Sequence, residues 1–264
     1  MPHFTPRAGF SLWRALVRQE LVNRYRGTLL GWAWPLLMPL VLLAVYGFVF
    51  GTVFKIRWPG QAEGHTAGFA LFLLAGLTVH GLLAEAVSGA PGVLVRQANF
   101  VRKVVFPLPV LPAVPLGVGL VHSAIGLALL AVVAAFSGYG PHLSALSVPL
   151  VLLPFIVMVW GMALLLAALG VYLRDLQQMS GVLVMLMLFV GPVFFPASMV
   201  PERWAWLLAA NPVTWPVESV RGALLEGHWP SVAGFATYTV FAALMLAVGW
   251  FAFAKLRRGF ADVL

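Results

Sequence analysis

Residues 31–54 read GWAWPLLMPLVLLAVYGFVFGTVF and contain no charged side chain. A helix rises about 1.5 Å per residue, so a run of this length crosses the ~30 Å hydrocarbon core of a lipid bilayer. The run begins after Arg26 and is longer than the ~7–15 apolar residues of a cleavable signal peptide. The sequence therefore predicts a helix that remains in the membrane.

Composition extends this prediction to the whole chain. Hydrophobic residues make up 62% of the 264 residues and charged residues 9%, whereas soluble domains carry ~25% charged residues. The apolar runs that we expect to span the membrane lie at 31–54, 67–88, 111–136, 147–172, 179–200 and 232–254. We therefore predict an all-α integral membrane protein with six transmembrane helices. It forms a single domain over 1–264, with a cytoplasmic segment 1–30, a six-span region 31–254 and a cytoplasmic tail 255–264.

The basic residues set the expected orientation. With both termini in the cytoplasm, twelve of the 16 basic residues lie inside and four outside, in keeping with the positive-inside rule. The inner set is Arg7, Arg14, Arg18, Arg24, Arg26, Arg96, Arg102, Lys103, Arg174, Lys255, Arg257 and Arg258. The outer set is Lys55, Arg57, Arg203 and Arg221. The net charge of +8 then follows from membrane topology and does not indicate a nucleic-acid partner.

An amphipathic segment precedes the first span. Phe10, Trp13, Val17 and Leu21 recur at spacings of three and four residues, which places them on one helical face. We expect this N-terminal helix to lie along the membrane surface with its aromatic face among the lipid headgroups. The simpler alternative is a basic anchor that only fixes the topology.

Two connecting segments carry recognisable patterns. Residues 91–109 are framed by prolines and form a basic cytoplasmic segment that suits docking of a soluble partner. Residues 201–229 are broken by prolines and hold four tryptophans, a residue typical of membrane interfaces. We predict that this outer segment forms short re-entrant helices between spans five and six.

The sequence lacks the motifs of several enzyme classes. It has no Gly-x-x-x-x-Gly-Lys-Ser/Thr phosphate loop, so we expect no ATP hydrolysis by this chain itself. It has neither a His-Glu-x-x-His run nor a Gly-x-Ser-x-Gly elbow. It has no cysteine, which excludes thiolate metal sites and cysteine nucleophiles. We therefore predict no catalytic residue, no metal site and no cofactor in this chain.

Few charged groups enter the predicted spans. Glu85 is the one carboxylate clearly within a span, and unpaired charge in hydrocarbon is costly, so it is a functional candidate. The structural alternative is a pair with a basic residue of the next loop, such as Arg96. His80 lies on a different helix face from Glu85, which disfavours a proton relay. Arg174 and Asp175 either cap the fourth span or contact a partner.

An aromatic stripe runs along the first span. Tyr46, Phe50 and Phe54 stand at i, i+4 and i+8, and Gly47 and Gly51 form a Gly-x-x-x-Gly notch beside them. Such a stripe serves helix packing, and stacked rings also bind the faces of sugars. The residues alone leave both interpretations open.

Four blocks of sequence carry a family resemblance. They are RYRGTLLGWAWPLLMP at 24–39, NFVRKVVFP at 99–107, Arg174-Asp175 followed by GPVFFP at 191–196, and Asn211-Pro212 with the ending RGFADVL at 258–264. Taken in order, they resemble the permease subunits of ABC-2 type polysaccharide exporters, which move O-antigen, capsule or teichoic-acid chains. Met38 stands where that family usually has asparagine. The resemblance covers nearly the whole chain.

The resemblance implies a homodimer joined to two cytoplasmic ATPase subunits that bind ATP and Mg. Lipid-linked polysaccharide would cross the cytoplasmic membrane of a bacterium through a channel at the dimer interface, lined by the first and fifth spans. The residues implied in ATPase docking are Arg14, Arg18, Arg24, Arg96, Asn99, Arg102, Lys103, Arg174 and Asp175. The channel and glycan residues are Tyr46, Phe50, Phe54, Phe189, Phe194 and Phe195. The outer gate is Trp204, Trp206, Asn211, Pro212 and Trp215.

Three alternatives compete with this interpretation. An ABC-2 permease for a drug or small lipid shares the architecture, but such relatives usually lack the GFADVL ending. A membrane-embedded glycosyltransferase or acyltransferase needs a cluster of carboxylates or histidines in an aqueous loop, and the acidic residues here are few and dispersed. An assembly or scaffold subunit without a transport path is the third. We favour the polysaccharide exporter.

Overall fold

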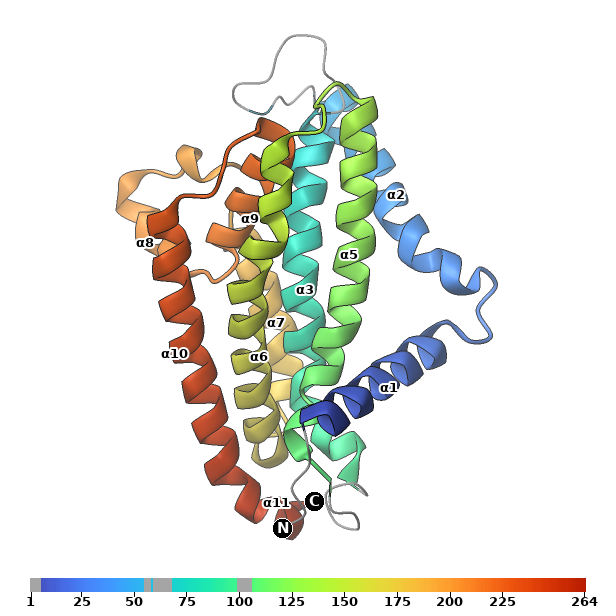
Figure 1. The fold of residues 1–264 in the computed structure, drawn as a ribbon, viewed down its shortest axis with the longest axis vertical. Helices are drawn as coiled ribbons and strands as arrows, with labels where there is room; N and C mark the ends of the chain where they lie inside the picture. Colours follow the sequence, from blue (N-terminus) through green and yellow to red (C-terminus); the bar gives the residue numbers. More distant parts are fainter. Residues whose placement is uncertain (1–5, 55–57, 59–67, 99–105) are drawn as a thin grey trace.

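The computed structural model describes residues 6–54, 58, 68–98 and 106–264 of the chain. Throughout these ranges the regular elements are all helices (Figure 1). The main ones are α1 (Pro6–Tyr25), α2 (Trp34–Tyr46), α3 (Gly68–Arg96), α5 (Ala113–Phe136), α6 (Val148–Tyr172), α7 (Leu176–Val190) and α10 (Val232–Leu256). The short ones are α8 (Ala205–Ala210), α9 (Thr214–Arg221) and α11 (Phe260–Val263), and π-helical turns extend α2 through Gly47–Val53 and α9 through Gly222–Glu226. The predicted all-α class is confirmed.

Within the described residues, five helical runs are long and apolar enough to cross a membrane. They are Gly31–Phe50, Gly68–Arg96, Leu108–Phe136, Leu143–Tyr172 and Val232–Val263. Each overlaps a run predicted from the sequence, so the length and apolar composition of the runs identified these five segments.

The remaining prediction, a span over 179–200, differs from the structure. The apolar helix there is α7, which has 15 residues and ends at Val190. Gly191 is extended and Pro192 lacks the N–H that a continuing helix needs, so the chain turns away. At 1.5 Å per residue α7 is about 22 Å long, shorter than the ~30 Å hydrocarbon core.

Helix α3 forms the centre of the bundle. It packs against α2, α5, α6, α7 and α9 (Figure 1). Leu71, Leu73 and Leu82 are almost completely buried, as expected of an apolar helix at the centre of a bundle.

Helix α10 packs along α6 at the opposite edge of the bundle, and glycines allow the close contact. A Cβ built on Gly161 would lie 2.6 Å from the backbone nitrogen of Leu246, and a Cβ on Gly249 would overlap the backbone of Gly161. Small residues at such crossings let two apolar helices gain dispersion contacts in a lipid environment.

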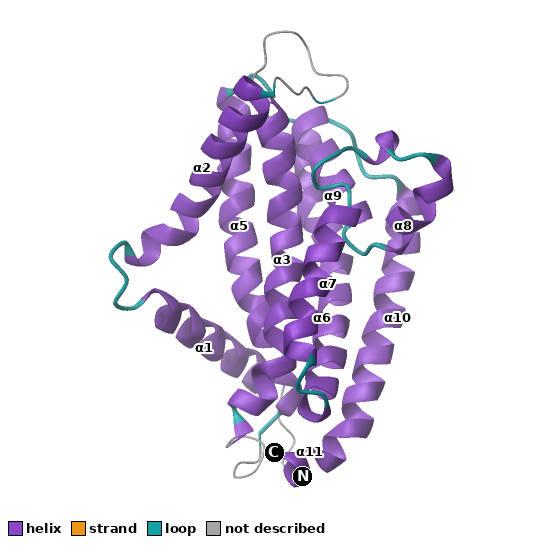
Figure 2. Ribbon diagram, turned by 180° about the vertical axis from the view of Figure 1, so that it is seen from behind, coloured by secondary structure: helices purple, strands orange, loops and turns teal. Residues whose placement is uncertain are grey.

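Helices α1 and α2 diverge from the bundle and form a wedge beside it (Figure 2). The apolar face of α1 does not lie free, because Val17 and Leu21 are buried against Val114 and Val118 of α5. The indole Nε1 of Trp13 donates a hydrogen bond of 2.8 Å to the carbonyl of Ala113. The expectation that this whole face lies among lipid headgroups is therefore wrong for its inner positions.

The C-terminal residues fold back on the end of α6. Phe260 of α11 is completely buried, with its ring 6.1 Å from that of Tyr172 and 5.6 Å from that of Phe253. The Tyr172 hydroxyl donates to the carbonyl of Leu256 at 2.9 Å. The ending RGFADVL is thus an ordered part of the bundle.

We expect Gly161→Leu to destabilise the chain, because the added side chain forces α6 and α10 apart. Overpacking of this kind lowers the free energy of unfolding by about 1–3 kcal/mol. Thermal unfolding of the purified protein in detergent measures the change. The control is Gly181→Leu on α7, where an added Cβ meets no atom within 4 Å, and equal stability of the two variants would contradict the assigned crossing.

Candidate functional site

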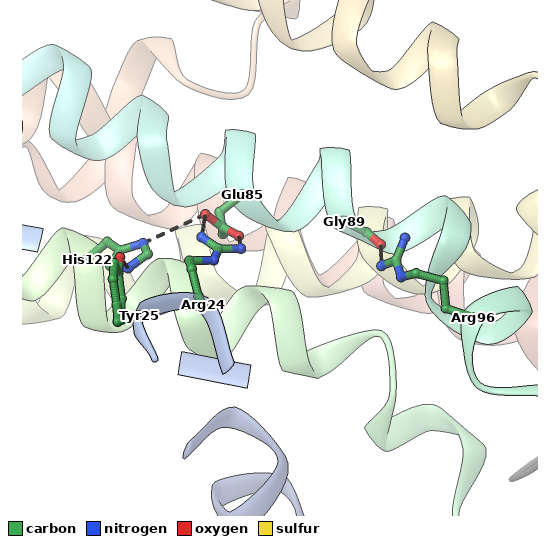
Figure 3. A network of polar contacts seen from close by, with 6 residues as sticks. All are labelled: Arg24, Tyr25, Glu85, Gly89, Arg96 and His122. Carbon is green, nitrogen blue, oxygen red and sulfur yellow. Dashed lines mark hydrogen bonds and ion pairs between the residues drawn. The ribbon is translucent and has the colours of Figure 1, made fainter. Parts of the chain in front are cut away.

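A polar cluster joins the C-terminal end of α1 to α3 and α5. Arg24 binds Glu85 of α3 through two hydrogen bonds, from Nη1 to Oε2 at 2.9 Å and from Nη2 to Oε1 at 2.6 Å (Figure 3). The next residue, Tyr25, has its hydroxyl 2.7 Å from Nε2 of His122 on α5. Two consecutive residues of α1 therefore contact two different spans.

The Arg24–Glu85 ion pair neutralises the carboxylate that α3 carries into the bundle. The Glu85 side chain is 22% exposed, and an isolated carboxylate at such a place is costly. A bidentate guanidinium satisfies both oxygens with charge-assisted hydrogen bonds. The hydrogen bond to Glu85 also raises the pKa of Arg24, so the cation persists at every physiological pH.

His122 completes the cluster from α5. Its Nδ1 lies 3.7 Å from Oε2 of Glu85, while its Nε2 faces Tyr25. Burial raises the pKa of the Tyr25 hydroxyl, so that group stays protonated and can donate to Nε2. This arrangement fits the tautomer that carries its proton on Nδ1, directed at the carboxylate.

The sequence indicated Arg96 as a partner for Glu85, and the structure corrects this. The Nη2 of Arg96 donates to the carbonyl of Gly89 on its own helix at 3.2 Å (Figure 3). His80 is directed to α7, with Nε2 3.1 Å from the carbonyl of Val184, and it takes no part in the cluster. Arg24 was missed because it lies 61 residues from Glu85, a separation that helical periodicity does not address.

Two cavities adjoin the cluster. One has a volume of about 460 Å³ and lies between α2, α3 and α5, with Tyr25, Glu85 and His122 at its polar end. The other has a volume of about 440 Å³, and its lining is Arg24, Gly81, Ala84, Glu85, Ser88 and Gly89. The first cavity is otherwise lined by apolar side chains and a few small polar ones.

The aromatic stripe of the first span is present as a row of rings. The ring centroids of Tyr46 and Phe50 are 5.9 Å apart, and those of Phe50 and Phe54 are 6.0 Å apart. Phe50 also contacts Phe69 of α3 at 5.1 Å, whereas Phe54 is 63% exposed. The stripe therefore packs on α3 at Phe50 and is exposed on the surface of the chain at Phe54.

The second aromatic group surrounds the end of α7. Phe189 stacks on Phe194 with centroids 5.3 Å apart, and Phe195 is half-buried nearby in the sequence. Phe189 is 54% exposed on a helix face that also exposes Met185 and Leu186. Within one chain, α3 packs against both α2 and α7, the two helices that carry the aromatic groups.

The residues expected to contact an ATPase occupy one end of the bundle where they are described. Arg14 and Arg18 are exposed on α1, and Arg174 and Asp175 are exposed between α6 and α7. Arg24 instead holds Glu85, as described above. Asn99, Arg102 and Lys103 lie outside the described residues.

The outer segment is held by buried hydrogen bonds. Nδ2 of Asn211 donates to the carbonyl of Met187 at 2.8 Å, and the hydroxyl of Tyr238 donates to the carbonyl of Pro212 at 2.7 Å. The ring of Trp215 stacks on that of Tyr238 at 4.9 Å. Trp204 and Trp206, in contrast, are exposed, as residues that face lipid or a partner would be.

Arg221, at the end of α9, is a buried charged residue whose contacts sequence reasoning missed. It is 2% exposed, and its guanidinium donates to the carbonyls of Phe72, Pro192 and Val193. Its Cζ lies 4.6 Å from the ring centroid of Trp58, a cation–π geometry. Arg221 therefore joins the outer segment to the start of α3 and to the turn after α7. The signal available in the sequence was Glu218, three residues earlier, which lies 3.4 Å from Nη1.

Comparison with known proteins gives consistent matches over most of the chain. The family model described as ABC-2 type transporter matches residues 11–225. A protein of Klebsiella pneumoniae named O-antigen export system permease protein RfbA is 24% identical over 97% of this chain and 95% of its own length. A protein of the same name from Myxococcus xanthus is 27% identical over 94% and 93%. The polysialic acid transport protein KpsM of Escherichia coli is 24% identical over 92% and 94%.

We expect Arg221→Gln to lower the free energy of unfolding by about 2–4 kcal/mol, because several buried carbonyls lose a charged donor. Thermal unfolding in detergent measures the loss. The matched control is Arg203→Gln, an exposed arginine 6.0 Å from the ring of Trp204. A stability equal to that of the control would contradict the role given to the buried guanidinium.

Proposed function

Since this chain belongs to the ABC-2 type transporter family, we propose that it is the membrane-spanning subunit of an ATP-driven exporter of lipid-linked polysaccharide. The cargo class is O-antigen, capsule or a similar chain, and the site of action is the cytoplasmic membrane of a bacterium. The observation that carries the proposal is alignment over nearly the whole length of relatives named for O-antigen export and polysialic acid transport. The competing family member, a permease for a drug or small lipid, has no such support among these relatives.

The ATPase of this exporter is a separate subunit. The chain has no phosphate loop, so it cannot hydrolyse ATP unaided. Two ATPase subunits would bind ATP and Mg and dock at the end of the bundle that carries Arg14, Arg18, Arg174 and Asp175. The exposed positive charge of α1 suits an acidic docking surface.

The transport path lies between two copies of the chain. α2 and α7 both expose apolar side chains, among them Leu36 and Val45 on α2 and Val182 and Met185 on α7. A homodimer that joins these helices would bring the aromatic groups of the first and fifth spans to one channel. Smooth ring faces would let a glycan slide without fixing one register.

The topology has both termini in the cytoplasm. α7 with the residues that follow it to 200 acts as the fifth of six spans, and α8 and α9 are the re-entrant pair at the outer surface. Both are short, with six and eight residues, and Arg221 ties α9 to α3. Trp204, Trp206 and Trp215 would close the channel or anchor it at the interface.

The direct test deletes the gene for this chain in its own organism. We expect polysaccharide to accumulate inside the cell and surface polysaccharide to return when the wild-type chain is supplied. Unchanged surface polysaccharide in the deletion strain would reject the exporter. Lost export of a drug or small lipid instead would favour the other class of permease.

We expect charge reversal at Arg102 and Lys103 to uncouple the ATPase while the protein still inserts into the membrane. The reason is that the basic segment between the second and third spans would no longer fit an acidic docking surface. ATP hydrolysis by the purified complex and surface polysaccharide in cells measure the effect. The control reverses Lys255 and Arg257, which are exposed near the chain end, and equal activity of both double variants would contradict the docking assignment.

We expect alanine at both Tyr46 and Phe50 to reduce export several-fold more than it reduces membrane abundance, because the glycan loses two ring faces. Pulse labelling of surface polysaccharide, corrected for protein level by immunoblot, gives the rate. The matched control is alanine at both Phe241 and Phe251, two exposed aromatic residues of α10. Equal export rates for the two double variants would count against the aromatic track.

A further inference from the structure

Helix α7 has few buried side chains to fix its position. Of its 15 residues, all of which the structure describes, Ser180 alone is buried. The side chains that pack against the core, Leu183, Val184, Met187 and Leu188, are only half-buried. In a bilayer such shallow apolar contact specifies the position of a helix poorly, because lipid chains solvate the same side chains equally well. Contacts of another kind are needed to hold α7.

Two buried polar side chains supply such contacts through the backbone of α7. His80 of α3 is 5% exposed, and its Nε2 lies 3.1 Å from the carbonyl oxygen of Val184. A carbonyl oxygen only accepts, so Nε2 carries the proton and donates it. Asn211 donates from Nδ2 to the carbonyl of Met187 at 2.8 Å. Each oxygen has two lone pairs, so it can accept such a bond beside its helical one.

The two carbonyls lie on the face of α7 opposite its exposed ring. Val184 and Met187 are three residues apart and share one face of the helix. Phe189 follows two residues later, about 200° around the helix from Met187. It is 54% exposed and stacks on Phe194. A rotation or shift of α7 that breaks either hydrogen bond therefore moves this ring.

Both donors are themselves held in place. The Oδ1 of Asn211 accepts a hydrogen bond of 3.1 Å from the backbone nitrogen of Val213, which fixes the orientation of the amide. A Cβ at Gly191 would lie 2.9 Å from Nδ2 of Asn211, so the glycine leaves room for this approach. His80 lies on the central helix α3, where Val79 is fully buried beside it. The bundle thus provides a fixed reference for α7.

We infer that His80 and Asn211 are positioning residues of the transport path, which hold two carbonyls of α7 and thereby set where Phe189 faces that path. The inference rests on the proposed function, in which this ring contacts the glycan. Neither donor contacts the glycan itself. Attachment through backbone carbonyls leaves the side chains of α7 free to face the path and the second copy of the chain.

Four variants separate the hydrogen bonds from packing. His80→Leu removes the donor and keeps a buried apolar side chain, whereas His80→Gln retains an N–H donor and restores the contact. Asn211→Leu is an independent variant, because it removes the donor to Met187 and leaves His80 in place. The matched control is Ser180→Ala. The Oγ of Ser180 donates to the carbonyl of Gln177 within α7, so its loss removes a buried polar group but no link between elements.

The position of the ring is measured by ¹⁹F NMR of the purified complex in nanodiscs, with 4-trifluoromethylphenylalanine at position 189. We expect one resonance, at the same shift, in the wild type, His80→Gln and Ser180→Ala. We expect a shifted or split resonance in His80→Leu and in Asn211→Leu. In cells that carry the natural Phe189, export per protein should fall at least about threefold in the same two variants, in keeping with the loss of one buried hydrogen bond.

A wild-type resonance in both His80→Leu and Asn211→Leu would overturn the positioning role, even if thermal unfolding showed lower stability. Failure of His80→Gln to restore the resonance would assign the effect to side-chain volume and reject the hydrogen bond. An equal shift in Ser180→Ala would reject the specific link between α3 and α7. Normal export despite a shifted resonance would reject the connection to transport. Failure of the proposed function is separate, since it appears as normal surface polysaccharide in cells that lack the chain.

Discussion

The organisation of this protein depends on the cost of placing a charge among apolar helices without a partner. The charge of Glu85 on α3 would be energetically unfavourable without a partner, and Arg24 donates a hydrogen bond to each of its two carboxylate oxygens. That contact draws the end of α1 against the bundle, while Val17 and Leu21 pack on α5. The position of the amphipathic helix therefore follows from this ion pair, the small apolar patch and the hydrogen bonds of Trp13 and Tyr25 to α5.

The same constraint acts at the other end of α3. Arg221 is buried and donates hydrogen bonds to three carbonyl groups, one from the start of α3 and two from the turn after α7. A Cβ at Gly76 would lie 2.5 Å from the guanidinium, so the glycine leaves room for it. α3 thus contacts both the polar cluster near α1 and the outer segment.

Local sequence predicted most of the fold, because long apolar runs and basic flanks are local features. Five spans appear as expected, and the shorter α7 follows from Gly191 and Pro192, whose effect on the helix end outweighed the apolar run through them. The site was less accessible to the same reasoning. Glu85 was identified as unusual, yet its partner Arg24 is remote in sequence, and Arg221 was counted only as an outer charge. Tertiary pairing decides both, and hydrophobic periodicity carries no information about it.

The burial of Arg221 has a consequence for biosynthesis. Chains are made from the N-terminus, so Arg24 is already present when Glu85 enters the bilayer, and that ion pair can form early. The carbonyls of Pro192 and Val193 instead accept hydrogen bonds from Arg221, which is synthesised 28 residues after Val193. The hydrogen bonds of Arg221 therefore form only when α9 meets α3 and the turn after α7. Synthesis that stops before residue 221 would leave the carbonyls of Phe72, Pro192 and Val193 without this charged donor.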